Sequence, residues 1–224
     1  MLLWLQNVLL PDELERLRRI AASETFVDGR GTAGRLVSDA KRNEELEPSR
    51  KRREELNALF FGAVNRNQTF IVGARPKRIL PPIISRYKPG MTYGDHVDNA
   101  IGNPTDDPVR IDLSMTLFLS DPASYGGGEL VIHTEYGTQK IKLPAGDAIV
   151  YPTTFLHHVA PVTEGVRLAA IAWMQSLVRD AEKRKMLYDV SVLAEWVHKK
   201  APSQSAEAHL MEKIRMNLLR MWVD

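Results

Sequence analysis

Apolar and polar residues alternate along residues 111–120, a pattern that predicts a β-strand with one buried face. The apolar positions are Ile111, Leu113, Met115, Leu117 and Leu119, and the polar positions are Asp112, Ser114, Thr116 and Ser120, with Phe118 as the exception. Shorter strands are predicted at 129–133, 139–143 and 148–151, each preceded by a turn that contains glycine. Short strands separated by such turns are typical of an antiparallel sandwich or barrel.

Helical patterns precede these strands. Pro11 suits the first turn of a helix, and the apolar residues after it recur at helical spacing. Residues 44–60 predict one or two helices, with Pro48 at the start of the second. The acidic pairs Glu44–Glu45 and Glu54–Glu55 are therefore interpreted as exposed helix surface and not as an acid/base pair.

The C-terminal region returns to helical periodicity. One apolar stripe comprises Met186, Val190, Leu193 and Val197, and a second, after the break at residues 201–203, comprises Leu210, Ile214 and Leu218. Such apolar stripes pack either against the rest of the chain or against a partner subunit. Packing within the chain is the simpler expectation, and a homo-oligomer formed through these helices is the alternative.

Length and composition indicate one packed domain with extensions. The chain has 224 residues, of which 44% are hydrophobic, enough for a substantial core. The predicted organisation is an N-terminal strand and helical support over residues 1–76, a core over 77–178 and a helical extension over 179–224. The predicted class is α+β with a mainly β core.

Net charge and cysteine content exclude several classes of function. The net charge of +2 gives no strong field to recruit nucleic acid or an anionic membrane. Cysteine is absent, which excludes disulfides, thiolate metal sites and cysteine nucleophiles. The apolar segment 1–5 lacks the basic start and small-residue cleavage site of a signal peptide. We interpret it as a core strand and expect a cytoplasmic protein.

His96-Val97-Asp98 is the most informative motif in the chain. Residues two apart project from the same face of a strand, so His96 and Asp98 can point at one centre. A histidine from a distant strand would complete a set of two imidazoles and one carboxylate. Such a set leaves coordination positions open, which suits non-haem Fe(II).

Leu156-His157-His158-Val159 offers that second histidine. Strand alternation lets only one of His157 and His158 face inward. Arg167, ten residues after His157, could pair its planar guanidinium with the far carboxylate of an oxoacid chelated to the iron. His133 has no matching partner in the sequence and is interpreted as structural.

Two stretches resemble the iron- and 2-oxoglutarate-dependent dioxygenases of the prolyl 4-hydroxylase class. They are Arg86-Tyr87-Lys88-Pro89-Gly90 with Tyr93-Gly94-Asp95-His96-Val97-Asp98, and Tyr151-Pro152 with Leu156-His157, Pro161-Val162-Thr163 and Gly165-Val166-Arg167. With residues 172–176 and Arg179-Asp180, the whole chain is similar to the bacterial PKHD-type hydroxylases.

This resemblance implies a double-stranded β-helix, or jelly roll, flanked by N-terminal helices and a C-terminal helical extension. It selects His157 over His158 as the third metal ligand beside His96 and Asp98. It also assigns Arg167 to the C5 carboxylate of 2-oxoglutarate and implies that Tyr87 hydrogen-bonds the oxoacid.

The implied activity is hydroxylation of a substrate that the sequence does not identify, either a small molecule or a peptide. Fe(II) and ascorbate are the implied cofactors, 2-oxoglutarate and O2 are consumed, and succinate and CO2 are released. Loops at 99–108 and 121–128 are expected beside the metal, where loops commonly carry specificity.

Two other functions stay open at this point. One is a non-catalytic sensor or binding module for iron and 2-oxoglutarate on the same fold. The other is a metal-dependent hydrolase that uses the open position for activated water. Arg167 argues against simple iron binding, because an iron site alone needs no oxoacid anchor.

Overall fold

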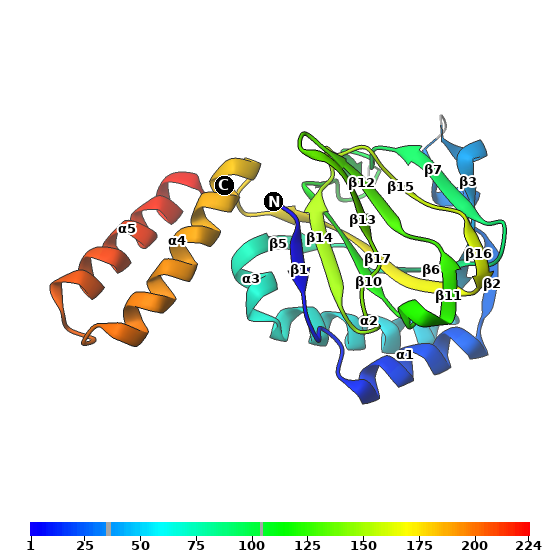
Figure 1. Ribbon diagram of the computed structural model, residues 1–224, viewed down its shortest axis with the longest axis horizontal. Helices are drawn as coiled ribbons and strands as arrows, with labels where there is room; N and C mark the ends of the chain where they lie inside the picture. Colours follow the sequence, from blue (N-terminus) through cyan, green and yellow to red (C-terminus); the bar gives the residue numbers. More distant parts are fainter. Residues whose placement is uncertain (35–36, 104) are drawn as a thin grey trace.

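Two antiparallel sheets form the centre of the computed structural model, which describes residues 1–34, 37–103 and 105–224 (Figure 1). Helices cover the larger sheet on one side, and a pair of helices projects at the C-terminal end. This arrangement confirms the predicted α+β class with a mainly β, jelly-roll core. No helix within the described residues is both long and apolar enough to span a membrane.

The larger sheet joins strands from the whole length of the chain. Its strands are β1 (Leu3–Leu5), β2 (Thr25–Asp28), β4 (Glu44–Glu47), β5 (Pro76–Ile79), β6 (Ile83–Tyr87), β10 (Leu113–Phe118), β14 (Ala148–Pro152) and β17 (Arg167–Ser176). They run in the order β1-β14-β10-β17-β6-β4-β2, with β5 also paired to β17. The predicted N-terminal core strand is therefore confirmed as β1, which pairs with β14.

The smaller sheet lies opposite and carries much of the candidate site. Its strands are β3 (Lys41–Arg42), β7 (Thr92–His96), β12 (Leu130–Thr134), β13 (Gly137–Ile141) and β15 (His157–Val159), in the order β13-β12-β15-β7-β3. Two short ribbons complete the described strands: β8 (Ile101–Gly102) with β9 (Val109–Arg110), and β11 (Tyr125–Gly127) with β16 (Val162–Gly165).

Three N-terminal helices form the support of the larger sheet: α1 (Pro11–Ser23), α2 (Arg50–Arg66) and α3 (Gln68–Ala74). Pro11 stands in the first turn of α1, as predicted. Apolar side chains of these helices, among them Leu17, Phe60 and Phe70, join those of β10 and β17 in one buried cluster. Short 3-10 turns lie at Gly29–Thr32, Ser38–Ala40 and Pro122–Ser124.

The prediction of a helix from residue 44 is wrong. Residues Glu44–Glu47 form β4, which pairs with both β2 and β6, and α2 begins only at Arg50, after Pro48. Within this strand Glu45 and Leu46 are buried. Pairing with β2 on one side and β6 on the other favours the extended conformation here, even though the local sequence has a helical pattern.

The prediction of a half-buried strand at residues 111–120 is also wrong in one respect. All six residues of β10 are buried. One face packs on the helices through Leu113, Met115 and Leu117, and the polar face with Ser114 and Thr116 turns into the space between the sheets. The alternating pattern identified the strand, but its polar side faces a cavity and not bulk solvent.

The C-terminal helices α4 (Ala181–Lys200) and α5 (Ala206–Trp222) pack against one another and extend away from the sheets (Figure 1). The expectation that their apolar stripes pack within the chain is wrong for much of each stripe. Leu193 is 50% exposed and Ile214 is 43% exposed, and neighbouring Trp196 is 59% exposed. The alternative, a homo-oligomer, stays a prediction.

We expect the fold to survive removal of the metal. The large buried cluster joins the N-terminal helices to the larger sheet through apolar contacts that involve no metal ligand, and a chain of this length buries enough surface to be stable without an ion. Thermal melts with and without a chelator should both show a cooperative transition, with a modest fall in Tm for the apo form. Complete unfolding on chelation would instead make the metal structural.

Candidate metal and oxoacid site

His96, Asp98 and His157 come together at the inner face of the smaller sheet. His96 ends β7 and lies opposite His157, the first residue of β15. Asp98 follows two residues after His96, so that its carboxylate oxygens lie 4.0 Å from His96 Nε2 and 3.8 Å from His157 Nε2. One ligand atom from each residue lies within 4.8 Å of the others. The three residues that the sequence singled out therefore share one potential metal centre.

Backbone carbonyls orient both imidazoles toward that centre. His96 Nδ1 lies 2.8 Å from the oxygen of Gly94, and His157 Nδ1 lies 3.0 Å from the oxygen of Phe155. A carbonyl oxygen only accepts, so each Nδ1 carries a hydrogen and each Nε2 keeps a free lone pair directed at Asp98. Burial lowers the pKa of His96, which favours the neutral imidazole that ligates metal.

Ser114 holds the carboxylate in place. Its hydroxyl, on the polar face of β10, donates a short hydrogen bond to Asp98 Oδ2. On the other side of the site, the Tyr93 ring stacks on His96 with 3.7 Å between ring centroids. Ser114 was not identified from the sequence as a site residue, because its contact depends on two sheets facing each other. Its position on the polar face of a strand was the available signal.

Loss of the Ser114 hydroxyl should weaken metal binding. Partners of metal ligands typically change metal affinity by about 10- to 100-fold when mutated, so we expect Ser114→Ala to lower Fe(II) affinity by about tenfold or more. Anaerobic titration with Fe(II) measures the change. Thr153→Val is the matched control, since Thr153 donates its buried hydroxyl to the Ile111 carbonyl and not to Asp98. Equal affinities of the two variants would contradict the assigned role.

Arg167 lies in the same cavity and forms no ion pair with another residue that the structure describes. It is the first residue of β17, opposite Tyr87 of β6, and is fully buried. Its Nε, Nη1 and Nη2 atoms have no hydrogen-bond partner within the described residues. The guanidinium lies 5.1 Å from the Tyr87 ring centroid and 5.7 Å from that of Phe118. A buried cation without a partner is costly, so this group fits a site built for an anionic ligand.

Two tyrosines add further donors near Arg167. Burial raises the pKa of Tyr87 to about 12, so its hydroxyl stays protonated and able to donate. Burial also raises the pKa of Tyr125, opposed by the Arg167 cation, and the Tyr125 hydroxyl has no partner in the described part of the chain. Gly128 leaves space for the Arg167 and Tyr125 side chains, because a Cβ there would lie 3.1 Å from Arg167 Cδ and 3.0 Å from the Tyr125 ring. Tyr125 was missed in the sequence, where only its place before three glycines set it apart.

A cavity of about 740 Å³ contains the metal centre and Arg167. Its aromatic walls include Tyr87, Tyr93, Tyr151 and Trp173. Tyr151 meets His157 edge-on, with 5.1 Å between ring centroids. The cavity is large enough for a small oxoacid and part of a second molecule.

A buried ion pair forms another part of the wall. Lys41 Nζ donates to Glu45 Oε1 at 2.5 Å and to Thr32 Oγ1 at 2.6 Å, and all three residues line the cavity. The interpretation of Glu45 as exposed helix surface is therefore wrong. Glu44, on the other face of β4, is paired with Arg86 and Lys88.

The two predicted loops contribute differently. From residues 99–108, Asn99, Ile101, Gly102 and Asn103 line the cavity, while Pro104 lies outside the described residues. No residue of 121–128 lines the cavity, and Tyr125–Gly127 form β11, so the expectation of a loop beside the metal is wrong for this segment. It lies next to Arg167 instead, since a Cβ on Gly128 would be 3.1 Å from Arg167 Cδ.

His133 and His158 lie on the opposite face of the smaller sheet. His158 Nδ1 is 2.6 Å from Asp95 Oδ1, and His133 Nε2 is 3.2 Å from the same oxygen. The interpretation of His133 as a residue without a matching partner is wrong, since a carboxylate from β7 and a histidine from β15 meet it.

Comparison with known proteins places this site in a family. Residues 82–175 match the model of the 2OG-Fe(II) oxygenase superfamily. The chain is 43% identical to a PKHD-type hydroxylase of Xanthomonas campestris pv. campestris (strain B100) and 44% identical to one of Paraburkholderia xenovorans (strain LB400), with 100% of each chain covered. A prolyl-4-hydroxylase structure from Pseudomonas putida is 21% identical with a TM-score of 0.52, covering 78% of this chain and 92% of that one. The last comparison bears on the fold alone.

Proposed function

Because the chain belongs to the PKHD-type hydroxylases of the 2OG-Fe(II) oxygenase superfamily, we propose a role for each residue of its site. The protein is an Fe(II)- and 2-oxoglutarate-dependent dioxygenase, an oxidoreductase. We assign His96, Asp98 and His157 to the iron and Arg167 to the C5 carboxylate of 2-oxoglutarate. Tyr87 then donates a hydrogen bond to the oxoacid.

The unpaired guanidinium of Arg167 carries this proposal. Arg167 is fully buried and its three nitrogens have no hydrogen-bond partner among the described residues, so it offers a carboxylate two parallel N–H donors. It shares its cavity with a nitrogen and oxygen donor set free of thiolates, which suits iron. A simple iron store would need no such cation.

Each group then has a defined task. The bound iron supplies the activation of O2 that leads to hydroxylation of a substrate and conversion of 2-oxoglutarate to succinate and CO2. The chain supplies position: Arg167 and Tyr87 orient the oxoacid, and Ser114 orients the Asp98 carboxylate. The aromatic walls of the cavity limit the access of water to the reacting atoms.

Anaerobic addition of Fe(II) and 2-oxoglutarate to the apo protein tests the proposal. A metal-to-ligand charge-transfer absorption band is expected, because the oxoacid chelates the iron. With O2 admitted, 2-oxoglutarate should be converted slowly to succinate even without substrate. Iron binding without the band would favour a non-catalytic iron site, and hydrolysis that needs no O2 would favour a metal-dependent hydrolase. A band without any turnover would favour a sensor of iron and 2-oxoglutarate.

We also propose that ascorbate sustains turnover by returning oxidised iron to Fe(II), and that the protein works in the cytoplasm. The family resemblance supports the first, and the need for ferrous iron supports the second. Ascorbate should increase the number of turnovers before inactivation, measured as succinate released per iron. Fractionation of cells that make the full chain tests the location.

For the exposed stripes of α4 and α5 we propose self-association into a homo-oligomer. Leu193 and Trp196 of α4 and Ile214 of α5 expose apolar side chains on a helix pair that extends from the sheets. Light scattering should give a molar mass above that of one chain, and Leu193→Glu should lower it. A monomer at all concentrations would contradict this assembly.

A further inference from the structure

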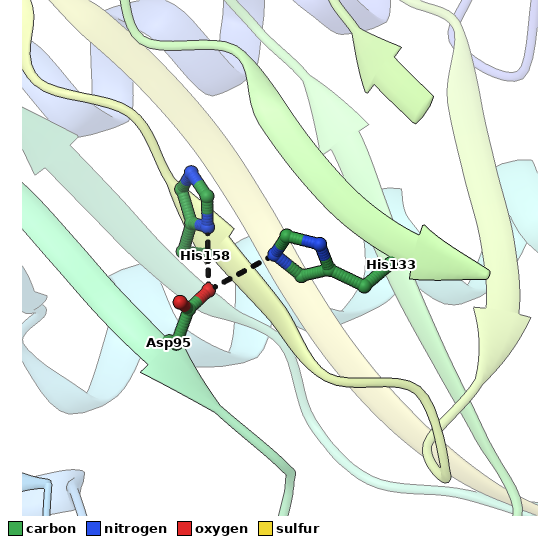
Figure 2. A group of neighbouring side chains, drawn as sticks. All are labelled: Asp95, His133 and His158. Carbon is green, nitrogen blue, oxygen red and sulfur yellow. Dashed lines mark hydrogen bonds and ion pairs between the residues drawn. The ribbon is translucent and has the colours of Figure 1, made fainter. Parts of the chain in front are cut away.

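A second cluster of metal-ligating side chains lies on the outer face of the smaller sheet, as Figure 2 shows. It consists of Asp95 from β7, His133 from β12 and His158 from β15. Asp95 precedes His96 and His158 follows His157 in the sequence. Strand alternation, which turns His96 and His157 into the cavity, therefore turns their neighbours outward.

Both imidazoles converge on one carboxylate oxygen. Asp95 Oδ1 lies 2.6 Å from His158 Nδ1 and 3.2 Å from His133 Nε2, and the two rings are 5.5 Å apart at their centroids. Bonds of about 2.1 Å in tetrahedral geometry place ligand atoms about 3.4 Å apart. The 3.2 Å between Asp95 Oδ1 and His133 Nε2 is close to this spacing. His158 Nδ1 would need to move about 0.8 Å farther from Asp95 Oδ1.

The side chains have room for that adjustment. Their exposed fractions are 53% for Asp95, 37% for His133 and 28% for His158. The three backbones lie on adjacent strands in the order β12-β15-β7, so the donors are held close together while their tips remain accessible to an ion from solvent.

A further hydrogen bond orients His133. Its Nδ1 lies 3.3 Å from the hydroxyl oxygen of Thr138, on the neighbouring strand β13. That oxygen can accept from a protonated Nδ1, which leaves the lone pair of Nε2 directed at the centre of the cluster. Metal-bound histidines are commonly oriented through their second nitrogen in this way.

We propose that Asp95, His133 and His158 bind a divalent transition metal ion of the Zn²⁺ type, distinct from the catalytic iron. Two imidazoles and one carboxylate suit Zn²⁺, Co²⁺ or Ni²⁺, and water completes the coordination on the exposed side. The ion links three adjacent strands, two of which carry iron ligands on their inner face. It thereby links the three strands from outside and stabilises the sheet.

The ordinary alternative is an ion-pair network. Exposed pairs of this kind contribute about 0–1 kcal/mol and require no metal. The two hypotheses differ in a measurable quantity, the number of Zn²⁺ ions that the full chain binds once the inner site has been disabled.

The experiment uses the full-length Asp98→Ala/His157→Ala variant, which lacks two inner ligands. Equilibrium dialysis of this variant against Zn²⁺ should find one equivalent bound per chain. Adding His133→Ala or Asp95→Asn should remove it, with at least a tenfold loss of affinity. Adding His209→Ala should leave it in place, since His209 is an exposed histidine of α5 and controls for adventitious binding.

Thermal melts provide an independent readout. Zn²⁺ should raise the Tm of the variant that retains the outer cluster, because an ion that binds the folded state stabilises it. It should not raise the Tm when His133→Ala is added. Circular dichroism checks that each variant is folded, as expected for exposed positions.

The result that overturns the proposal is clear. Zn²⁺ absent from the Asp98→Ala/His157→Ala variant, or retained after His133→Ala, would leave Asp95, His133 and His158 as an ion-pair network only. Neither result would bear on the assignment of iron to the inner site, which the anaerobic titration with 2-oxoglutarate tests separately.

Discussion

His157→Ala is expected to abolish iron-dependent turnover, whereas His158→Ala should retain most of it. The two histidines are adjacent in the sequence, but His157 Nε2 faces Asp98 inside the cavity and His158 faces Asp95 outside it. His96→Ala and Asp98→Ala should be as damaging as His157→Ala, because each removes one of three protein donors. Conversion of 2-oxoglutarate to succinate under O2 measures the activity without a known substrate.

The control for this series is the metal-to-ligand charge-transfer band formed with Fe(II) and 2-oxoglutarate, which reports iron in the cavity that holds Arg167. His158→Ala should keep this band, and His157→Ala should lose it. The reverse pattern would show that the inward and outward histidines have been assigned the wrong way round.

Arg167→Ala is expected to lower the affinity for 2-oxoglutarate by about ten- to a hundredfold. A hydrogen bond to a charged group is worth about 1.5–3 kcal/mol, and about 1.4 kcal/mol corresponds to a factor of ten in affinity. The affinity for Fe(II) alone should change much less, because Arg167 is not a metal ligand. Anaerobic titration of 2-oxoglutarate into the Fe(II) forms of wild type and variant measures both.

Arg167→Lys is the matched control for charge. An ammonium keeps the positive charge but lacks the planar pair of donors, so it should recover only part of the lost affinity. An unchanged affinity in a folded Arg167→Ala protein would rule out the anchor role. It would also return attention to functions in which the iron binds no oxoacid.

The convergence of His96 and Asp98 could be predicted because it depends on local sequence. His96 and Asp98 stand two apart at the end of a strand, so their shared face follows from the geometry of one segment. The family pattern then selected His157 over His158 and assigned Arg167 to the oxoacid. The structure brings these four residues to one cavity.

The surroundings of the site could not be predicted in the same way. Ser114 touches Asp98 and Glu45 lines the cavity only because distant strands meet across the fold. Local sequence made Glu45 resemble helix surface, and the alternation around Ser114 suggested a face in solvent. In both cases a polar side chain points into the space between the sheets and not into bulk water.

The C-terminal helices illustrate a different limit. Their apolar periodicity predicted the helices themselves, which the structure has as α4 and α5. Periodicity indicates that one face of a helix is apolar, but it does not identify the surface that packs against that face. The chain itself leaves Leu193 and Trp196 largely uncovered.

The back-to-back arrangement of the two clusters has a consequence for folding. Side chains change face when a strand slips by one residue, so a slip of β15 and β7 would exchange His157 for His158 and His96 for Asp95. The pairing of β15 with β7 shifts register between His157 and Val159. This irregularity fits only one alignment of the two strands and therefore disfavours such a slip. A chain in the wrong register would still present imidazole and carboxylate on both faces. With metal assigned to both clusters as proposed, metal content is a poor measure of correct folding for this protein, whereas 2-oxoglutarate binding is a good one, since Arg167 belongs to the other sheet.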